Sequence, residues 1–83
     1  MTVRADKLLS IWELRLNIHA DGRLKWADQT RSAIEGLVSR LRLLSADEEI
    51  EIDGDEHSDP MAKFIRVSTG EVLAELYQAP PRA

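Results

Sequence analysis

Cysteine is absent from this chain of 83 residues, and glycine, proline and aromatic residues are few. Without cysteine the fold cannot depend on disulfides or on thiolate-bound zinc, which fits a reducing compartment. Apolar residues never run together for more than a few positions, so we expect no membrane span. The charged opening stretch, MTVRADKLLSIWEL, does not resemble a secretory signal. We therefore expect a cytoplasmic protein.

Groups that would support catalysis are also scarce. The four glycines are scattered, so no phosphate-binding loop is present, and no serine lies in a glycine-flanked turn. Carboxylates are plentiful but fall in a highly charged stretch, where nothing raises their pKa as a general acid requires. A chain of this length also leaves little room for a pocket of several hundred cubic ångströms. We expect no enzyme and no cofactor.

The acidic residues are concentrated in one segment. Residues 47–59 carry eight Asp or Glu and no Lys or Arg, whereas residues 1–46 carry eight Lys or Arg and five Asp or Glu. The net charge of −4 therefore has its origin in this segment. One interpretation is a solvated strand edge and loop. The other is a negative surface that steers a basic partner or imitates the charge pattern of nucleic acid.

Metal binding has weak support in the same segment. The run from Glu49 to Gly54 matches the first half of a helix–loop–helix calcium loop, but the position of the bidentate carboxylate holds Pro60. His57 lies among acids without a second nitrogen ligand nearby, and His19 is far along the chain. We expect no metal site.

The strongest structural signal is a helix over residues 28–45. Five apolar residues of the stretch fall on one helical stripe: Ile34, Leu37, Val38, Leu41 and Leu44. Asp28 is the expected N-cap, with a later start at a Ser32–Glu35 capping box as the alternative. Gly36 costs such a helix about 1 kcal/mol relative to alanine. We favour the interpretation that a strand passes close to Gly36 over the interpretation that Gly36 belongs to a contact site.

The first 27 residues are harder to interpret. Apolar and polar residues alternate over residues 11–20, which predicts a half-buried strand, and a helix continuing from residue 3 is the alternative. Asp21-Gly22 predicts a hairpin with Gly22 in the left-handed conformation and a second strand over residues 23–27. Residues 1–10 form either an arm or a short helix capped by Thr2.

Three more strands follow the helix, over residues 48–53, 61–68 and 71–78, with a hairpin at Thr69-Gly70. In the register that we expect, Val67 faces Val72. Phe64, Leu73 and Tyr77 then lie on the sheet face that the helix does not cover. The N-terminal arm, a second copy of the chain or a foreign partner would have to cover that face.

These elements predict one α+β domain over residues 1–83, a small antiparallel sheet with one helix packed on one face. The order is ββαβββ, preceded by the arm and followed by a loose tail at residues 79–83.

Basic residues alternate with acids along residues 23–42, and Trp26 faces the core in our register, so we expect no nucleic-acid binding.

One stretch resembles a known family. Residues 63–76, KFIRVSTGEVLAEL, look like the terminal hairpin of FlaG-type flagellar proteins, in which a Thr-Gly-Glu-Val turn joins two strands. The resemblance covers about a sixth of the chain and implies a flagellar accessory role. The helix that follows the hairpin in that family has no counterpart before Pro80-Pro81.

The sequence thus predicts a small, non-enzymatic interaction or regulatory module that presents a sheet face and an acidic edge to a protein partner or as a homodimer. One alternative is an inhibitor, of the kind that phages and mobile elements encode, whose acidic segment mimics nucleic acid on a basic host protein. Another is the FlaG-like accessory role. The partner-binding residues that we predict are Phe64, Leu73, Tyr77, Glu49, Glu51, Asp53, Asp55 and Glu56.

Overall fold

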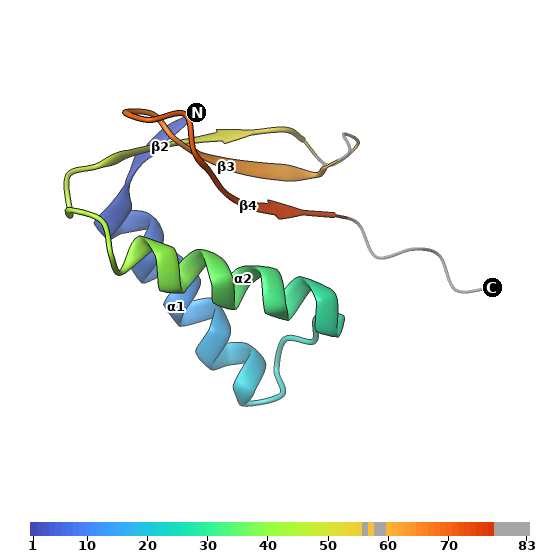
Figure 1. The fold of residues 1–83 in the computed structure, drawn as a ribbon. Helices are drawn as coiled ribbons and strands as arrows, with labels where there is room; N and C mark the ends of the chain where they lie inside the picture. Colours follow the sequence, from blue (N-terminus) through green and yellow to red (C-terminus); the bar gives the residue numbers. More distant parts are fainter. Residues whose placement is uncertain (56, 58–59, 78–83) are drawn as a thin grey trace.

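The fold is a four-stranded antiparallel sheet with two helices on one of its faces (Figure 1). A computed structural model describes residues 1–55, 57 and 60–77; the predicted tail lies outside them. The α+β class and the antiparallel sheet are confirmed. Along the chain the elements are β1 (Thr2–Arg4), α1 (Ala5–Ala20), α2 (Asp28–Leu41), β2 (Glu49–Asp53), β3 (Ala62–Arg66) and β4 (Val72–Leu76). Strands lie side by side in the order β1-β2-β3-β4.

Helix α2 is the predicted central helix. It begins at Asp28 and ends at Leu41. Ala27 is the N-cap, so both Asp28 as the cap and the later start at Ser32 are wrong. Four residues of its predicted apolar stripe are fully buried, and Leu44, just beyond the helix, packs against the same core. The stripe therefore faces the sheet and α1, as its spacing requires.

Helix α1 replaces the strand that we predicted over residues 11–20. The segment is rich in leucine, alanine and charged residues with high helix propensity and has few β-branched residues. Ala5, Leu8 and Trp12 lie on one face of α1 and pack into the core. Leu14, one of the alternating apolar residues, falls outside this face with 60% of its surface exposed, and so does Ile11 with 40%. The competing interpretation, a helix continuing from residue 3, is confirmed for residues 5–20, whereas residues 2–4 form β1.

The Asp21-Gly22 pair ends a helix and does not form a hairpin. Gly22 has a φ of 80°, as we predicted, because it follows the C-cap of α1. The Gly22 amide donates to His19 O at 3.0 Å and the Arg23 amide to Ile18 O at 3.2 Å, which is the Schellman arrangement. The predicted strand over residues 23–27 is therefore a connection between helices; Trp26 in it packs against the core, as expected.

Residues 1–10 belong to two elements. β1 adds to the edge of β2, with Val3 opposite Ile50, and α1 starts at once after it, so Thr2 is not a helix cap. The amide of Ala5 donates to Glu48 O at 2.8 Å, which anchors the start of α1 to the segment before β2. The arm is thus the fourth strand of the sheet.

The β3–β4 hairpin forms at the predicted turn, but its register differs, because Val72 lies opposite Ile65 and not opposite Val67. Phe64 pairs with Ala74 and Ile65 with Val72, so Leu73 is an extra residue that bulges from β4. Phe64 lies opposite Ile52 of β2, on the face that the helices cover, and Leu73 lies on the same face. Both residues are 1% exposed, so our expectation that they occupy the uncovered face is wrong.

One apolar core lies between the helices and the sheet. Trp12 meets the edge of the Phe64 ring at a centroid distance of 5.9 Å and lies 6.4 Å from Trp26. These contacts join α1, the connection between the helices and β3. The buried apolar residues are Ala5, Leu8, Ile34, Leu37, Val38, Leu41, Ile50, Phe64, Leu73 and Leu76.

Candidate functional site

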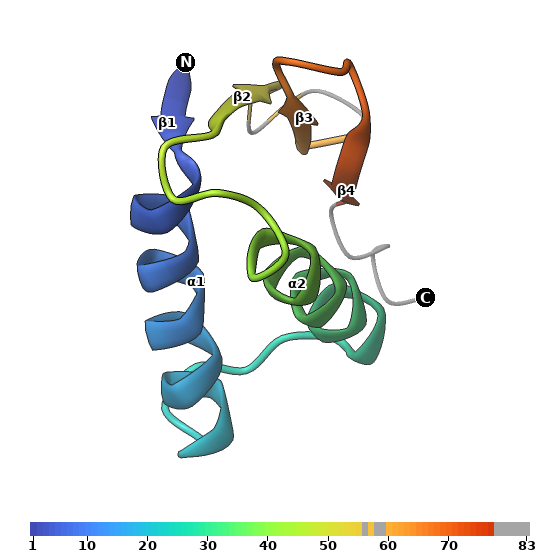
Figure 2. The ribbon, with the colours of Figure 1, turned by 60° about the vertical axis from the view of Figure 1, so that its left-hand side comes forward.

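The sheet face opposite the helices is uncovered in the part of the chain that the structure describes (Figures 1 and 2). Successive residues of β2 point to opposite faces, and Ile50 and Ile52 point toward the helices. Glu49, Glu51 and Asp53 therefore point outward, and all three are exposed. Their carboxylates form a single column, here called the acidic column, with a spacing of about 6.6 Å along the strand.

Apolar residues border the acidic column on the side of β3 and β4. Glu51 pairs with Ile65, and Ile65 pairs with Val72, so the three side chains share one row across the sheet. Val67 follows β3, and its amide donates to Glu49 O at 3.0 Å, which places it beside the column. Half of the Val67 surface and 40% of the Val72 surface are exposed. The outer face thus combines a negative column with the apolar patch Ile65, Val67 and Val72.

Only some of the predicted partner-binding residues lie on this face. The three acids of β2 do. Asp55 lies in the loop beyond β2, where its carboxylate accepts the His57 amide at 2.7 Å, and Glu56 falls outside the described residues. Phe64 and Leu73 are core residues. Tyr77, just past β4, is 44% exposed and donates its hydroxyl to the Glu75 carboxylate.

The apolar patch was missed by the sequence analysis. The alternation through β3 offers two sets of residues, one with Phe64 and one with Ile65 and Val67. A set can be assigned to a face only when the register is known. A large aromatic residue favours burial over exposure, and this signal would have assigned Phe64 to the core.

Glu48, next to the acidic column, serves a structural role. Its carboxylate accepts Arg66 Nε at 2.9 Å and Nη2 at 3.4 Å, and also the Ser68 hydroxyl. The hydrogen bond from Arg66 and then that from Ser68 hold the pKa of Glu48 below its ordinary value, and the carboxylate in turn raises the pKa of Arg66. The pair fixes the segment before β2 to the β3–β4 hairpin.

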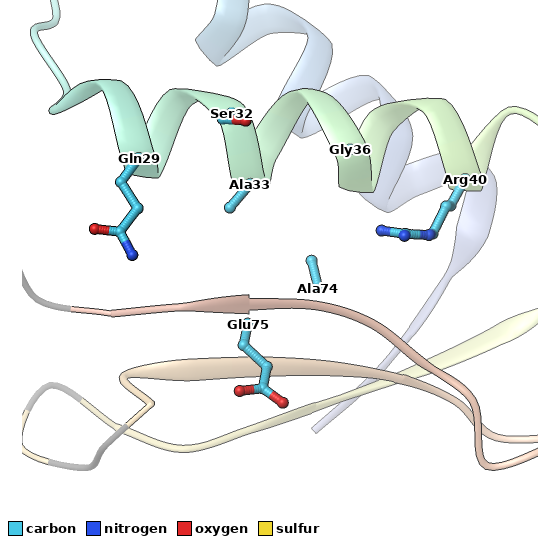
Figure 3. A pocket seen from close by; sticks show the side chains of 7 residues that line it. All are labelled: Gln29, Ser32, Ala33, Gly36, Arg40, Ala74 and Glu75. Atoms are coloured by element: carbon cyan, nitrogen blue, oxygen red, sulfur yellow. The ribbon is translucent and has the colours of Figure 1, made fainter.

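A groove of about 520 Å³ separates α2 from β4 (Figure 3). Arg40 lies at one end, where its Nη1 donates to Leu73 O at 2.7 Å. Gln29 lies at the other end, and the small residues Ala33 and Gly36 lie between them. The residues that line it are Gln29, Ser32, Ala33, Gly36, Arg40, Ala74 and Glu75.

Gly36 has no packing reason to be glycine. A β-carbon built there meets only Arg40 Nη1, at 3.5 Å, which is an ordinary van der Waals distance. Our favoured interpretation, that a strand passes close to Gly36, is wrong. The glycine nevertheless costs the helix about 1 kcal/mol of propensity relative to alanine. Its effect on the surface is to keep the groove open.

Two further grooves meet around Trp12 and Met61, on the side of α1. Their volumes are about 480 and 360 Å³, and both are lined mainly by apolar side chains. The Arg15 guanidinium lies 4.7 Å from the centroid of the Trp12 ring, a cation–π distance. The surface therefore has larger grooves than we expected from the length of the chain.

No group of three or more metal-ligating side chains comes together within residues 1–55, 57 and 60–77. His19 stacks on Trp26 at a centroid distance of 5.0 Å, and its Nδ1 lies 2.8 Å from Leu24 O, so this histidine holds the connection between the helices. Neither α1 nor α2 is long and apolar enough to cross a lipid bilayer.

Comparison with known proteins gives no match: no family model, no curated protein and no solved structure matches the chain. The comparison with family models thus adds nothing to the resemblance of residues 63–76 to FlaG-type hairpins, which stays a prediction. The function has to be argued from the surface of the molecule.

Proposed function

We propose that this chain is a cytoplasmic, non-enzymatic interaction module whose outer sheet face binds a basic protein partner. The observation that carries the proposal is the acidic column, which lies in the open beside the apolar patch Ile65, Val67 and Val72. Burial of apolar side chains at the centre of an interface supplies affinity, and charges around it set orientation and association rate. The matching partner surface has an apolar centre flanked by lysine or arginine.

The charge arrangement supports a partner of positive sign. Two bases lie at the ends of the column: Arg4 pairs with Glu49 and Lys63 with Asp53 across the strands, and the Arg4 side chain donates to the Asp6 carboxylate at 3.2 Å. Glu49 and Glu51 have no ion-pair partner in the part of the chain that the structure describes. The part of their field that Arg4 does not offset extends into the solvent, where it attracts cationic groups over about one Debye length, roughly 8 Å at physiological salt.

Charge reversal tests the proposal. We expect Glu49→Lys with Glu51→Lys to lose the protein that the unmodified chain captures from its source cell, while the fold persists. Asp21→Lys with Glu35→Lys makes the same change of net charge on the helical side and serves as the control. Equal capture of that protein by both double variants would refute the proposed face.

A second candidate function rests on the geometry of the column. Three carboxylates in a line on a rigid strand, spaced about 6.6 Å apart, present a regular negative array. An inhibitor that imitates nucleic acid requires such an array facing a basic groove. Competition distinguishes this candidate: duplex DNA or RNA should displace the chain from an inhibited host protein, whereas it should leave a partner held by the apolar patch in place.

A further inference from the structure

The outer edge of β4 has no strand beside it in the part of the chain that the structure describes. The opposite edge of the sheet is β1, which has only three residues, whereas β4 has five. Exposed edge strands present backbone donors and acceptors that pair readily with another chain, so proteins protect them or use them. Here the Arg40 guanidinium occupies one such acceptor, Leu73 O.

The groove between α2 and β4 continues this edge. A strand added beside β4 would lie about 4.8 Å from it and direct alternate side chains toward α2. The flank of α2 that it would meet consists of Ser32, Ala33 and Gly36, and Figure 3 shows open space between these residues and Ala74. Side chains of moderate size fit there because a β-carbon at Gly36 would itself have room.

Arg40 gives the groove a charge. Among the described residues its hydrogen-bond partner is the Leu73 carbonyl, and no carboxylate lies within ion-pair distance of it. Figure 3 shows its side chain reaching from α2 along the groove. A guanidinium carries five N–H donors, so several remain for a ligand. A carboxylate is the group that matches such a fork.

We propose that the groove binds an extended peptide segment of a protein partner, which joins the sheet as a fifth strand beside β4 and places a carboxylate on Arg40. Main-chain hydrogen bonds to β4 would supply the affinity, and the contacts with Gly36 and Arg40 the specificity. This surface is separate from the outer face on which the proposed function rests.

A second copy of the chain suits this edge less well. Pairing two β4 strands about a two-fold axis centred on Glu75 places the two Glu75 carboxylates directly opposite each other, which is unfavourable. Centring the axis on Ala74 keeps them diagonal neighbours and sets Glu75 against the bulged Leu73 of the other copy. A foreign segment avoids both arrangements.

Peptide selection tests the proposal with a defined probe. Random peptides of about twelve residues, displayed on phage, are selected on the full chain and counter-selected on Gly36→Leu, whose side chain fills the groove. We expect selected synthetic peptides to shift the amide resonances of β4 and of α2 residues 32–40. Their affinity should fall about tenfold or more for Gly36→Leu and stay within about twofold for Ser39→Leu, the matched control on the exposed helix surface.

Two further measurements address the binding mode. N-methylation at alternate peptide residues should abolish binding in one set and spare it in the other, because only one edge of the added strand faces β4. Exchange of the peptide carboxylate for an amide should weaken binding to the unmodified chain and change nothing for Arg40→Gln. Circular dichroism checks that every variant retains the fold.

Several outcomes would overturn the proposal. One is the failure of any peptide to distinguish the unmodified chain from Gly36→Leu, and another is equal sensitivity of both N-methylated sets. Dimerisation that Gly36→Leu abolishes would assign the edge to a second copy. Binding that appears only after removal of residues 78–83 would assign the groove to the chain's own C-terminal segment.

Discussion

Truncation of Phe64 is the sharpest test of the fold. The ring is 1% exposed, and it meets the edge of Trp12 at 5.9 Å between the sheet and α1. Phe64→Ala should therefore lower the free energy of unfolding by about 3–5 kcal/mol, the usual cost of emptying an aromatic core site. The same change at Val67, on the outer face and half exposed, should cost about 0.5 kcal/mol or less.

The magnitude matters because a domain of 83 residues has a total stability of roughly 4–12 kcal/mol. Phe64→Ala can remove most of that, so Phe64→Leu, with an expected loss of about 1–2 kcal/mol, keeps the measurement possible. Urea unfolding followed by circular dichroism and by tryptophan fluorescence gives both values. Similar, small losses at Phe64 and Val67 would place Phe64 on the outer face and refute the burial of this side of β3 under the helices.

Other predictions follow from single residues. Gly22→Ala should lower the free energy of unfolding by about 1 kcal/mol, because φ is +80° there. Gly36→Ala should raise the free energy of unfolding by up to about 1 kcal/mol. Thermal melts of the two variants should therefore shift in opposite directions. Arg66 lowers the pKa of Glu48 in the folded state, so this carboxylate stabilises the fold above its ordinary pKa of 4.5, and the contribution disappears as pH falls through the lowered value. Glu48→Gln should weaken the dependence of the free energy of unfolding on pH at acid pH. An unchanged pH dependence would contradict the stabilising role of the Glu48–Arg66 pair. Glu51→Lys should leave the urea midpoint nearly unchanged, because the side chain is exposed and unpaired within the described residues.

The parts of the fold that the sequence predicts are those with one dominant periodicity. Helix α2 carries its apolar residues at helical spacing, and β2 alternates Ile50 and Ile52 with acids, so each has one way to bury its apolar side. Their positions were predicted to within a few residues. The three exposed acids of β2 follow from the same alternation.

The failures come from segments where two patterns compete. Trp12, Leu14, Leu16 and Ile18 alternate like a strand, yet the helix gains more by burying Leu8 and Trp12 against α2 and leaves Leu14 exposed. The Asp21-Gly22 pair correctly predicts the left-handed conformation of Gly22. A hairpin turn and a Schellman cap both require that conformation, so it does not distinguish the two structures. Only tertiary packing distinguishes them.

Only the part of the candidate site that depends on a local sequence pattern could be predicted. The acidic column depends on local alternation alone. The apolar patch depends on which side of β3 the helices cover, which the register of β3 against β2 decides and which no local signal specifies. The groove beside β4 depends on where α2 lies relative to an edge strand, a relation between distant segments that only the assembled fold supplies.

A soluble paramagnetic agent, which broadens the methyl resonances of exposed side chains, tests most directly whether the outer face is open in the free protein. We predict strong broadening for Val67 and Val72 and little for Ile50 and Leu37, which lie under the helices. Protection of Val67 and Val72 equal to that of Ile50 would mean that this face is already covered, and it would contradict the proposal that a partner binds there.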